Sequence, residues 1–288
     1  MSIRPSSYML PPIPDSFRWT DESWGPALRC RPLEAVAPHL FTTRQLQLTS
    51  DADWQRVAKA VGASHVAMLT QVHGRAVVVA RDVPNGKPFD MAQGRPFDFA
   101  QGKPEADVLV GDNPDVALAV RAADCVPLLI ADRANGAVAA VHAGWRGTAA
   151  GAAAAAVDAL AREFGSKPDD LVAAIGPSIG ACCYEVGTEL VDAFAAAGHA
   201  RHLIDRWFLA PPPPRGGFRP ALSAVEGPRL RLDVAGANRD QLVLAGVPEA
   251  HIHLSGLCTA MELELLTSFR VEKEKAGRIA GVIRPRRP

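Results

Sequence analysis

Short apolar runs alternate with longer segments of helical spacing, and this pattern defines the elements that we expect. Residues 115–132, DVALAVRAADCVPLLIAD, hold two apolar runs around a polar centre, which predicts two strands. Residues 137–145, AVAAVHAGW, form a third run, and Asn135-Gly136 before it is a strong turn signal. We therefore expect 137–145 to return as the second arm of a β-hairpin.

The remaining pattern predicts helices and further strands. Three segments read as helices with a capping residue at or near the start: 147–165 with Thr148 and a stop at Gly165, 187–198 with Thr188, and 233–247 with Asp233. Apolar runs predict the other strands at 170–177, 251–257 and 277–284. Because the hairpin interrupts a strict strand–helix alternation, we favour an α+β fold, a mixed β-sheet sandwich flanked by helices.

Two segments depart from this pattern. Residues 87–94 and 95–102, KPFDMAQG and RPFDFAQG, repeat an eight-residue unit, but two copies are fewer than a solenoid needs. The segment 211–228, PPPPRGGFRPALSAVEGP, is too rich in proline and glycine for a helix or a sheet strand. We expect a single catalytic domain over 1–288 with flexible surface insertions at about 85–104 and 211–228.

Composition narrows the choice of function class. The 288 residues include 31 basic and 31 acidic side chains, so the net charge is zero and gives no attraction to nucleic acid or an anionic membrane. The first residues lack the apolar core of a secretion signal, and no apolar run is long enough to span a bilayer. The five cysteines are odd in number, which disfavours a disulfide framework. We expect a cytoplasmic protein with neither nucleic-acid nor membrane partners.

Reactive side chains gather at the ends of three apolar runs. They are Gln71 and His73 in LTQVHG, Arg121, Asp124 and Cys125 in RAADCVP, and His142 and Arg146 in VHAGWRG. Cys125 and His142 fall on opposite arms of the expected hairpin and are therefore candidates for near neighbours. The distance of His73 from them does not follow from the sequence. A thiolate and two imidazoles suit Zn²⁺, which in catalytic sites keeps a fourth position open.

Spacing alone leaves three interpretations of these residues open. The first is a metal site, the second a metal-free pair with Cys125 as nucleophile and His142 as base, and the third a buried cysteine among hydrogen-bonded histidines. Other cysteines and histidines occur in pairs, at Cys182-Cys183 and in the His-x-His of residues 251–253. Adjacent cysteines do not readily bridge each other, so we expect Cys182 and Cys183 to pack near the GPSIG turn rather than bind metal. We expect the histidine pair to be structural, because no third ligand is in view.

Four motifs in this order, TQVHG, ADCVPLL, AVHAGWRG and IGPSIGACCYEVG, resemble the family long labelled polyphenol oxidase, or laccase-domain, proteins. The resemblance covers nearly the whole chain outside the two insertions. It implies a mixed-sheet α+β sandwich and zinc-dependent phosphorolysis of purine nucleosides, with adenosine deaminase activity. The nucleosides that it implies are adenosine, inosine, guanosine and methylthioadenosine. It also implies that Zn²⁺ is bound by His73, Cys125 and His142. The partners would be purine nucleosides and inorganic phosphate, and the protein would be a monomer or homodimer.

A zinc site of this kind suggests roles for neighbouring side chains. Arg44 and Arg146 are our first choices for phosphate, because guanidinium groups match its oxygens in pairs. Gln71 would bind the base or orient a water molecule. Asp124, the acid nearest to a ligand in sequence, would carry the proton in deamination, beside Cys125 and His142 at the catalytic centre.

Three alternatives remain beside phosphorolysis. A thiol hydrolase would use Cys125 and His142 without metal, and a partner-binding protein would keep its function after Cys125→Ala. Polyphenol oxidase activity, which the family label suggests, needs on the order of ten histidines in a multicopper enzyme. This chain has eight, so the residues do not favour that chemistry.

Overall fold

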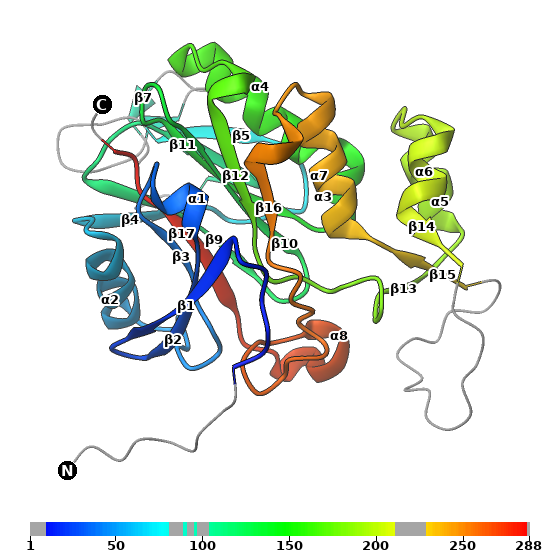
Figure 1. Cartoon of the computed structure of the whole chain (residues 1–288), viewed down its shortest axis with the longest axis horizontal. Helices are drawn as coiled ribbons and strands as arrows, with labels where there is room; N and C mark the ends of the chain where they lie inside the picture. The colour runs from blue at the N-terminus through cyan, green and yellow to red at the C-terminus, as the bar shows by residue number, and fades with distance from the viewer. Residues whose placement is uncertain (1–9, 81–88, 91–94, 97–103, 211–228, 287–288) are drawn as a thin grey trace.

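Two six-stranded mixed sheets form the centre of the protein (Figure 1). A computed structural model describes residues 10–80, 89–90, 95–96, 104–210 and 229–286. The expected insertion at 211–228 lies outside these residues. The other, at about 85–104, is described only at Pro104 and in two paired strands, β6 (Phe89–Asp90) and β7 (Arg95–Pro96).

The first sheet carries the amino-terminal strands. Its order is β1 (Phe17–Glu22), β2 (Gly25–Cys30), β3 (His39–Phe41), β17 (Ile279–Ile283), β9 (Val116–Ala122) and β4 (His65–Met68). Neighbouring strands are antiparallel except for β4 and β9, which are parallel. This sheet therefore brings the segments after β4 and after β9 to the same edge.

The second sheet contains the predicted hairpin. Its order is β16 (Ile252–Leu254), β12 (Leu171–Ile175), β10 (Val126–Asp132), β11 (Val138–Ala143), β8 (Val108–Gly111) and β5 (Val77–Ala80). The pairs β12–β16 and β5–β8 are parallel and the others antiparallel. A small third sheet joins β13 (Glu185–Gly187), β15 (Arg229–Leu232) and β14 (Phe208–Leu209). The expected mixed sandwich is confirmed.

Helices cover the outer faces of this sandwich (Figure 1). Helix α2 (Asp51–Val61) packs on the first sheet, and α4 (Ala152–Phe164) packs on the second beside α7 (Val234–Leu244). The shorter helices are α1 (Arg31–Glu34), α3 (Trp145–Ala150), α5 (Glu189–Ala196), α6 (Arg201–Trp207) and α8 (Phe269–Glu272), with 3₁₀ turns η2 (Pro168–Asp170), η3 (Glu249–His251) and η4 (Lys273–Lys275). Within the described residues, every helix is too short or too polar to cross a bilayer.

Strand β10 shows why the sequence of the sheets is so apolar. Leu128 and Ile130 join the core beneath the helices, whereas Leu129 and Ala131 join the core between the two sheets. Both faces are thus buried, and a continuous run of apolar residues follows. The predicted hairpin is confirmed, with β10 and β11 antiparallel and Pro127 opposite His142.

The helix expected over 147–165 is two helices. Gly151 separates α3 from α4 with a left-handed backbone, φ 85°, and Gly165 ends α4 as expected. Thr148 is not a cap: it lies inside α3, and its buried Oγ1 accepts a hydrogen bond from Asn238 Nδ2 at 2.9 Å. The other expected helices are α5 and α7, and the Asp233 side chain caps α7 by accepting from the Gly236 N–H.

Candidate metal centre

A cavity of about 1110 Å³ lies where several strands of the sandwich end. Its walls come from segments far apart in the chain: the loop after β4, the link between β9 and β10, the start of α3, and the segment around α8. The lining includes the candidate ligands together with five basic side chains, Arg121, Arg146, Arg270, Lys273 and Arg278. The cavity is therefore suited to an anionic ligand.

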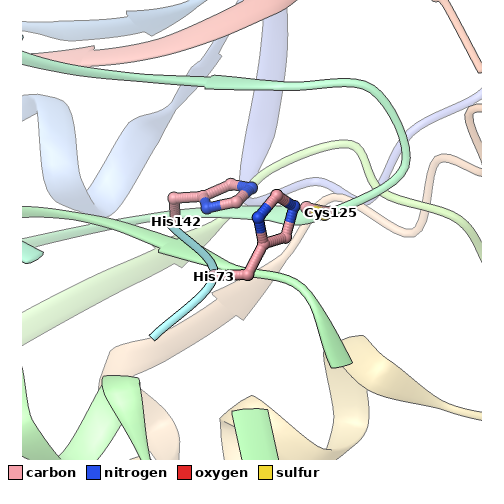
Figure 2. Close-up of side chains that lie close together, drawn as sticks. All are labelled: His73, Cys125 and His142. Atoms are coloured by element: carbon pink, nitrogen blue, oxygen red, sulfur yellow. The ribbon is translucent and has the colours of Figure 1, made fainter. Parts of the chain in front are cut away.

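The structure brings His73, Cys125 and His142 together at this cavity. One ligand atom from each lies within 4.8 Å of the others. Figure 2 shows the two imidazole rings next to each other, with Cys125 close to them. The two imidazole rings are 4.9 Å apart between centroids and nearly perpendicular, at 79°. His142 comes from β11, Cys125 from the link before β10, and His73 from the loop that the sequence could not position.

Unusual backbone geometry positions these side chains. His73 and Asp124, which precedes Cys125, both have positive φ angles, of 64° and 86°. Such conformations are costly outside glycine and persist where the surroundings enforce them, often at functional sites. Gly144 follows the His142 strand, and a Cβ added there would lie 2.8 Å from Cys125 Sγ and 3.2 Å from His73 Cδ2. Only glycine leaves room for the three side chains to converge.

Asp107, which the sequence analysis did not single out, holds this arrangement. Its buried carboxylate accepts a hydrogen bond from His142 Nδ1 at 2.8 Å, which leaves Nε2 as the free ligand atom. The same carboxylate accepts from the backbone N–H groups of the His73 loop: Val72 at 3.3 Å, His73 at 3.0 Å and Gly74 at 2.6 Å. A carboxylate behind a ligating histidine is a common feature of metal sites. The available sequence signal was an acid just before the apolar run VLVG.

The electrostatics favour a thiolate at the centre of the group. Burial opposes ionisation of Cys125, but hydrogen bonds from His142 and His73 outweigh it and lower the pKa of the thiol to about 7. Burial likewise opposes protonation of His142, while hydrogen bonds to Asp107 and Cys125 raise its pKa to about 9. The anionic groups thus stabilise positive charge at the point where the three side chains meet.

Two predicted site residues line the cavity but bind the protein itself. Gln71 donates from Nε2 to the Arg121 carbonyl at 2.7 Å and accepts from the Arg121 N–H at 2.8 Å. Asp124 accepts from Thr259 Oγ1 and from the Arg270 N–H, both at 2.6 Å. Both oxygens of Asp124 are engaged, so its carboxylate holds the cavity wall together.

Arg44, predicted to bind phosphate, does not line the cavity. Its guanidinium group donates to Glu272 Oε1 at 2.8 Å and to the carbonyls of Leu266, at 3.3 Å, and Leu263. Arg44 was assigned to phosphate because a guanidinium group matches phosphate oxygens in pairs. The structure instead uses it to fasten the segment around α8 to the loop after β3.

Aromatic side chains flank the basic residues of the cavity. The Arg146 guanidinium lies 4.3 Å from the centre of the Trp145 ring, and that of Arg270 lies 5.0 Å from the Tyr184 ring. All four residues line the cavity. Neither Tyr184 nor Arg270 was among the predicted site residues, although Tyr184 falls in the motif ACCYEVG. Their contribution depends on contacts between segments more than 80 residues apart, which spacing does not encode.

Residues 47–286 match the family described as multi-copper polyphenol oxidoreductase laccase. The chain belongs to this family. The resemblance seen in the motifs is thereby confirmed. The oxidase activity in the description is not supported: the described residues, which include all eight histidines, hold two groups able to ligate a metal, one of two histidines and a cysteine and one of three cysteines. Neither provides the histidine-rich ligand set of a multicopper oxidase.

Curated relatives carry other activities in their names. A purine nucleoside phosphorylase of Bacteroides thetaiotaomicron is 36% identical over 60% of this chain and 58% of its own length. One of Deinococcus radiodurans is 34% identical over 86% of this chain and 89% of its own. An adenosine deaminase, RL5, from an unknown prokaryote is 38% identical over 54% and 53%. Since the Bacteroides match spans less than two thirds of that relative, its activity is carried to this chain only as a proposal.

A solved structure supports the same relationship. The YfiH protein of Bacillus licheniformis superposes with a TM-score of 0.75 at 28% identity, over 94% of this chain and all of that one. The mixed-sheet fold is therefore shared along nearly the whole length of both chains.

Proposed function

We propose that this protein is a zinc-dependent purine nucleoside phosphorylase that also deaminates adenosine. It would convert adenosine, inosine or guanosine and phosphate into the free base and ribose 1-phosphate. The observation that carries the proposal is the convergence of His73, Cys125 and His142 on a cavity lined by basic and aromatic side chains. The names of the relatives support the same reaction class.

The three side chains fit a zinc ion by their chemistry. Two imidazoles and one thiol, within 4.8 Å of one another, are ligands that zinc accepts, and three protein ligands leave a position for substrate or water. When bound, the ion would supply a Lewis acid that polarises an oxygen atom. Asp107 would keep His142 in the tautomer that presents Nε2 and would keep the His73 loop closed.

The walls of the cavity supply the groups that phosphorolysis requires. We assign phosphate binding to Arg146 and Arg121, whose planar guanidinium groups can each pair with two phosphate oxygens. Tyr184 and Trp145 offer flat apolar faces on which a purine can stack. Asp124 would act as a positioning residue, since it holds Thr259 and the backbone of Arg270. Gln71 would position Arg121 through its two backbone hydrogen bonds.

Product chromatography tests the proposal directly. Zinc-loaded protein is incubated with adenosine, inosine or guanosine, with and without phosphate. We expect free base and ribose 1-phosphate only when phosphate is present, and inosine from adenosine in both conditions. His73→Ala should abolish both reactions, whereas the matched change His65→Ala, at an exposed strand position, should leave them unchanged. Zinc-loaded wild-type protein that forms none of these products would contradict the proposal.

A second candidate function, that of a thiol hydrolase, depends on the hydrogen-bonded series Cys125, His142 and Asp107. A thiol of lowered pKa, a base and an orienting carboxylate are the parts of a thiol hydrolase. The second imidazole, His73, is not one of these three parts, although it helps to lower the pKa of Cys125, and it supplies the third ligand of a metal site. Chelation separates the two: a thiol hydrolase stays active after the metal is removed, and the phosphorylase loses its activity.

A further inference from the structure

A second group of sulfur atoms lies outside the cavity described above. The Sγ atoms of Cys182, Cys183 and Cys258 lie within 4.8 Å of one another, and none of these residues lines the cavity. Cys182 and Cys183 lie in the turn before β13, and Cys258 follows β16, where it pairs with Ser178 in an isolated bridge. Cys182 is exposed, Cys183 half-buried and Cys258 buried, so an ion could reach the group from solvent.

The spacing of these sulfur atoms is that of metal ligands. Two thiolates on one tetrahedral zinc ion, each at about 2.3 Å, are about 3.8 Å apart. The Cys182 and Cys183 sulfur atoms are 3.5 Å apart here. The Gly180 N–H donates to Cys258 Sγ at 3.2 Å, the kind of hydrogen bond that orients a ligand from outside the metal sphere. A Cβ at Gly180 would lie only 3.2 Å from Cys182 Sγ, so the glycine permits this approach.

We propose that Cys182, Cys183 and Cys258 form a second metal site, which takes a thiophilic d¹⁰ ion, Cu⁺ or Zn²⁺. An all-sulfur set without nitrogen or oxygen ligands selects soft or borderline ions. Binding would replace the three thiol protons, which leave to solvent, by three sulfur–metal bonds. The group would then carry net negative charge, and Arg231 lies beside it, donating to the carbonyls of Ala181 and Cys182. Cys182 and Cys183 would then bind a metal ion in addition to the packing role that the sequence predicted.

A metal ion here would fasten two segments of the cavity wall. Cys183 precedes Tyr184, which lines the cavity, and Cys258 precedes Thr259, whose hydroxyl binds Asp124. The Ile179 N–H, in the same turn, donates to the Asp124 carbonyl at 2.9 Å. The site is nevertheless independent of the proposed reaction, because none of its ligands reaches the cavity.

Metal counting on four forms of the full-length chain tests this proposal. Reduced, metal-free wild type, His73→Ala, Cys182→Ser/Cys183→Ser and the combined triple variant are loaded without oxygen, either with Zn²⁺ or with Cu⁺ as its acetonitrile complex. After gel filtration, we expect His73→Ala and Cys182→Ser/Cys183→Ser each to bind one ion per chain fewer than wild type. The triple variant should bind none. The loading that saturates the three-cysteine group identifies the ion. Equal ion counts in wild type and Cys182→Ser/Cys183→Ser would overturn the proposal.

Cobalt spectroscopy adds a readout that counts sulfur ligands. With Co²⁺ bound, the thiolate charge-transfer band of His73→Ala should be about threefold stronger per ion than that of Cys182→Ser/Cys183→Ser, because three sulfur atoms replace one. Alkylation of unmodified wild type serves if a variant fails to fold. We expect bound metal to protect Cys182 from iodoacetamide, as read by peptide mass spectrometry. Unchanged alkylation of Cys182 in the presence of metal would overturn the proposal.

Discussion

At the scale of single residues, Asp107 links the chemistry of the site to the fold. One carboxylate orients His142 and accepts three backbone N–H groups from the loop that carries His73. Two of the three candidate ligands therefore depend on a residue outside the ligand group. Burial without charge pairing would be costly for this acid, and its hydrogen bonds keep its pKa below the ordinary value.

Asp107→Asn should weaken the metal site while leaving all three ligands in place. The amide cannot accept from His142 and from three backbone donors as the carboxylate does, so we expect an approximately 10- to 100-fold loss of zinc affinity or activity. Competition with a chelator of known affinity measures the zinc affinity, and initial rates measure the activity. Asp112→Asn, at an exposed position, is the matched control. Unaltered affinity in Asp107→Asn would show that the carboxylate does not support the ligands.

Gly144→Ala should displace the ligands directly. Its methyl group would overlap Cys125 Sγ, at 2.8 Å, so we expect zinc to be lost while circular dichroism shows a folded chain. Gly74→Ala is the matched control, since its Cβ would meet only the Asp107 carboxylate at an ordinary 3.7 Å. Metal content after dialysis distinguishes the two variants. Equal zinc in both would mean that the site relaxes around the added methyl group.

Sequence and structure agree at this scale where a motif carries the side chain. His73, Cys125 and His142 could be named beforehand because their motifs are specific, and their convergence is a matter of geometry that the structure supplies. Asp107 could not, because its role depends on a contact with His142 35 residues away. The contact of Arg44 with Glu272 could not be foreseen either, because it joins residues 228 positions apart.

At the scale of elements, the break between α3 and α4 positions the residues after the His142 strand. The alanine-rich segment 147–165 has helical propensity throughout, which is why the sequence predicted one helix. Gly151 allows the left-handed turn that ends α3, and the Thr148 and Asn238 side chains then join α3 to α7. Propensity fails here because the break serves tertiary contacts. The hairpin and the α7 cap were predictable because their signals are local.

Gly151→Ala should therefore destabilise the protein without a clash. No atom lies within 4 Å of an added Cβ, so the cost is that of a left-handed backbone at alanine, about 1 kcal/mol. Urea unfolding measures the difference. Gly151→Asn should cost less, because asparagine tolerates this conformation better than alanine. An alanine variant as stable as wild type would mean that the two helices can merge into one.

A buried histidine in strand β3, His39, should make the stability of the protein depend on pH. His39 is fully buried; its Nδ1 donates to the Ala37 carbonyl and its Nε2 accepts from the Cys30 N–H at 2.9 Å, which requires the neutral ring. Burial, opposed by the Ala37 hydrogen bond, lowers the pKa of His39 to about 4. The unfolded chain, with an ordinary histidine pKa of about 6.5, binds the proton more readily between these values.

The neutral ring of His39 should thus contribute fully to the free energy of unfolding above pH 6.5. This contribution should be lost as the pH falls from 6.5 to about 4. We expect it to account for about 3 kcal/mol of unfolding free energy over this window. Urea unfolding at several pH values gives the free energy of unfolding as a function of pH. Between pH 4 and pH 6.5 this free energy should change less steeply with pH for His39→Gln than for wild type. His65→Gln, at an exposed strand position, should keep the wild-type slope. Equal slopes in His39→Gln and wild type would contradict the assignment.

At the scale of the whole molecule, the sandwich assembles the cavity from segments that no single motif contains. The parallel pair β4–β9 brings the His73 loop and the Cys125 link to one edge, and the hairpin adds His142. The carboxyl-terminal segment closes the wall through Asp124 and Arg270. Fold class followed from the alternation of apolar runs, whereas these long-range neighbours follow from sheet order. The assignment of one domain to 1–288 stays a prediction.

An ion bound at this junction should stabilise the entire fold. A ligand that binds only the folded state adds roughly 3 kcal/mol when its free concentration is 100 times Kd. For a chain of this size we expect zinc to raise Tm by roughly 5 °C or more. The measurement uses the Cys182→Ser/Cys183→Ser variant, so that only the His73, Cys125 and His142 site contributes. Metal-free and zinc-loaded samples are compared by calorimetry.

Adding His73→Ala to this background should eliminate the zinc-dependent rise in Tm, because one of the three ligands is missing. His65→Ala in the same background should retain the rise, since this exposed residue lies outside the ligand group. A zinc effect that survives His73→Ala would place the stabilising ion elsewhere. Because Tm is read without substrate, that result would separate the position of the metal from the identity of the reaction.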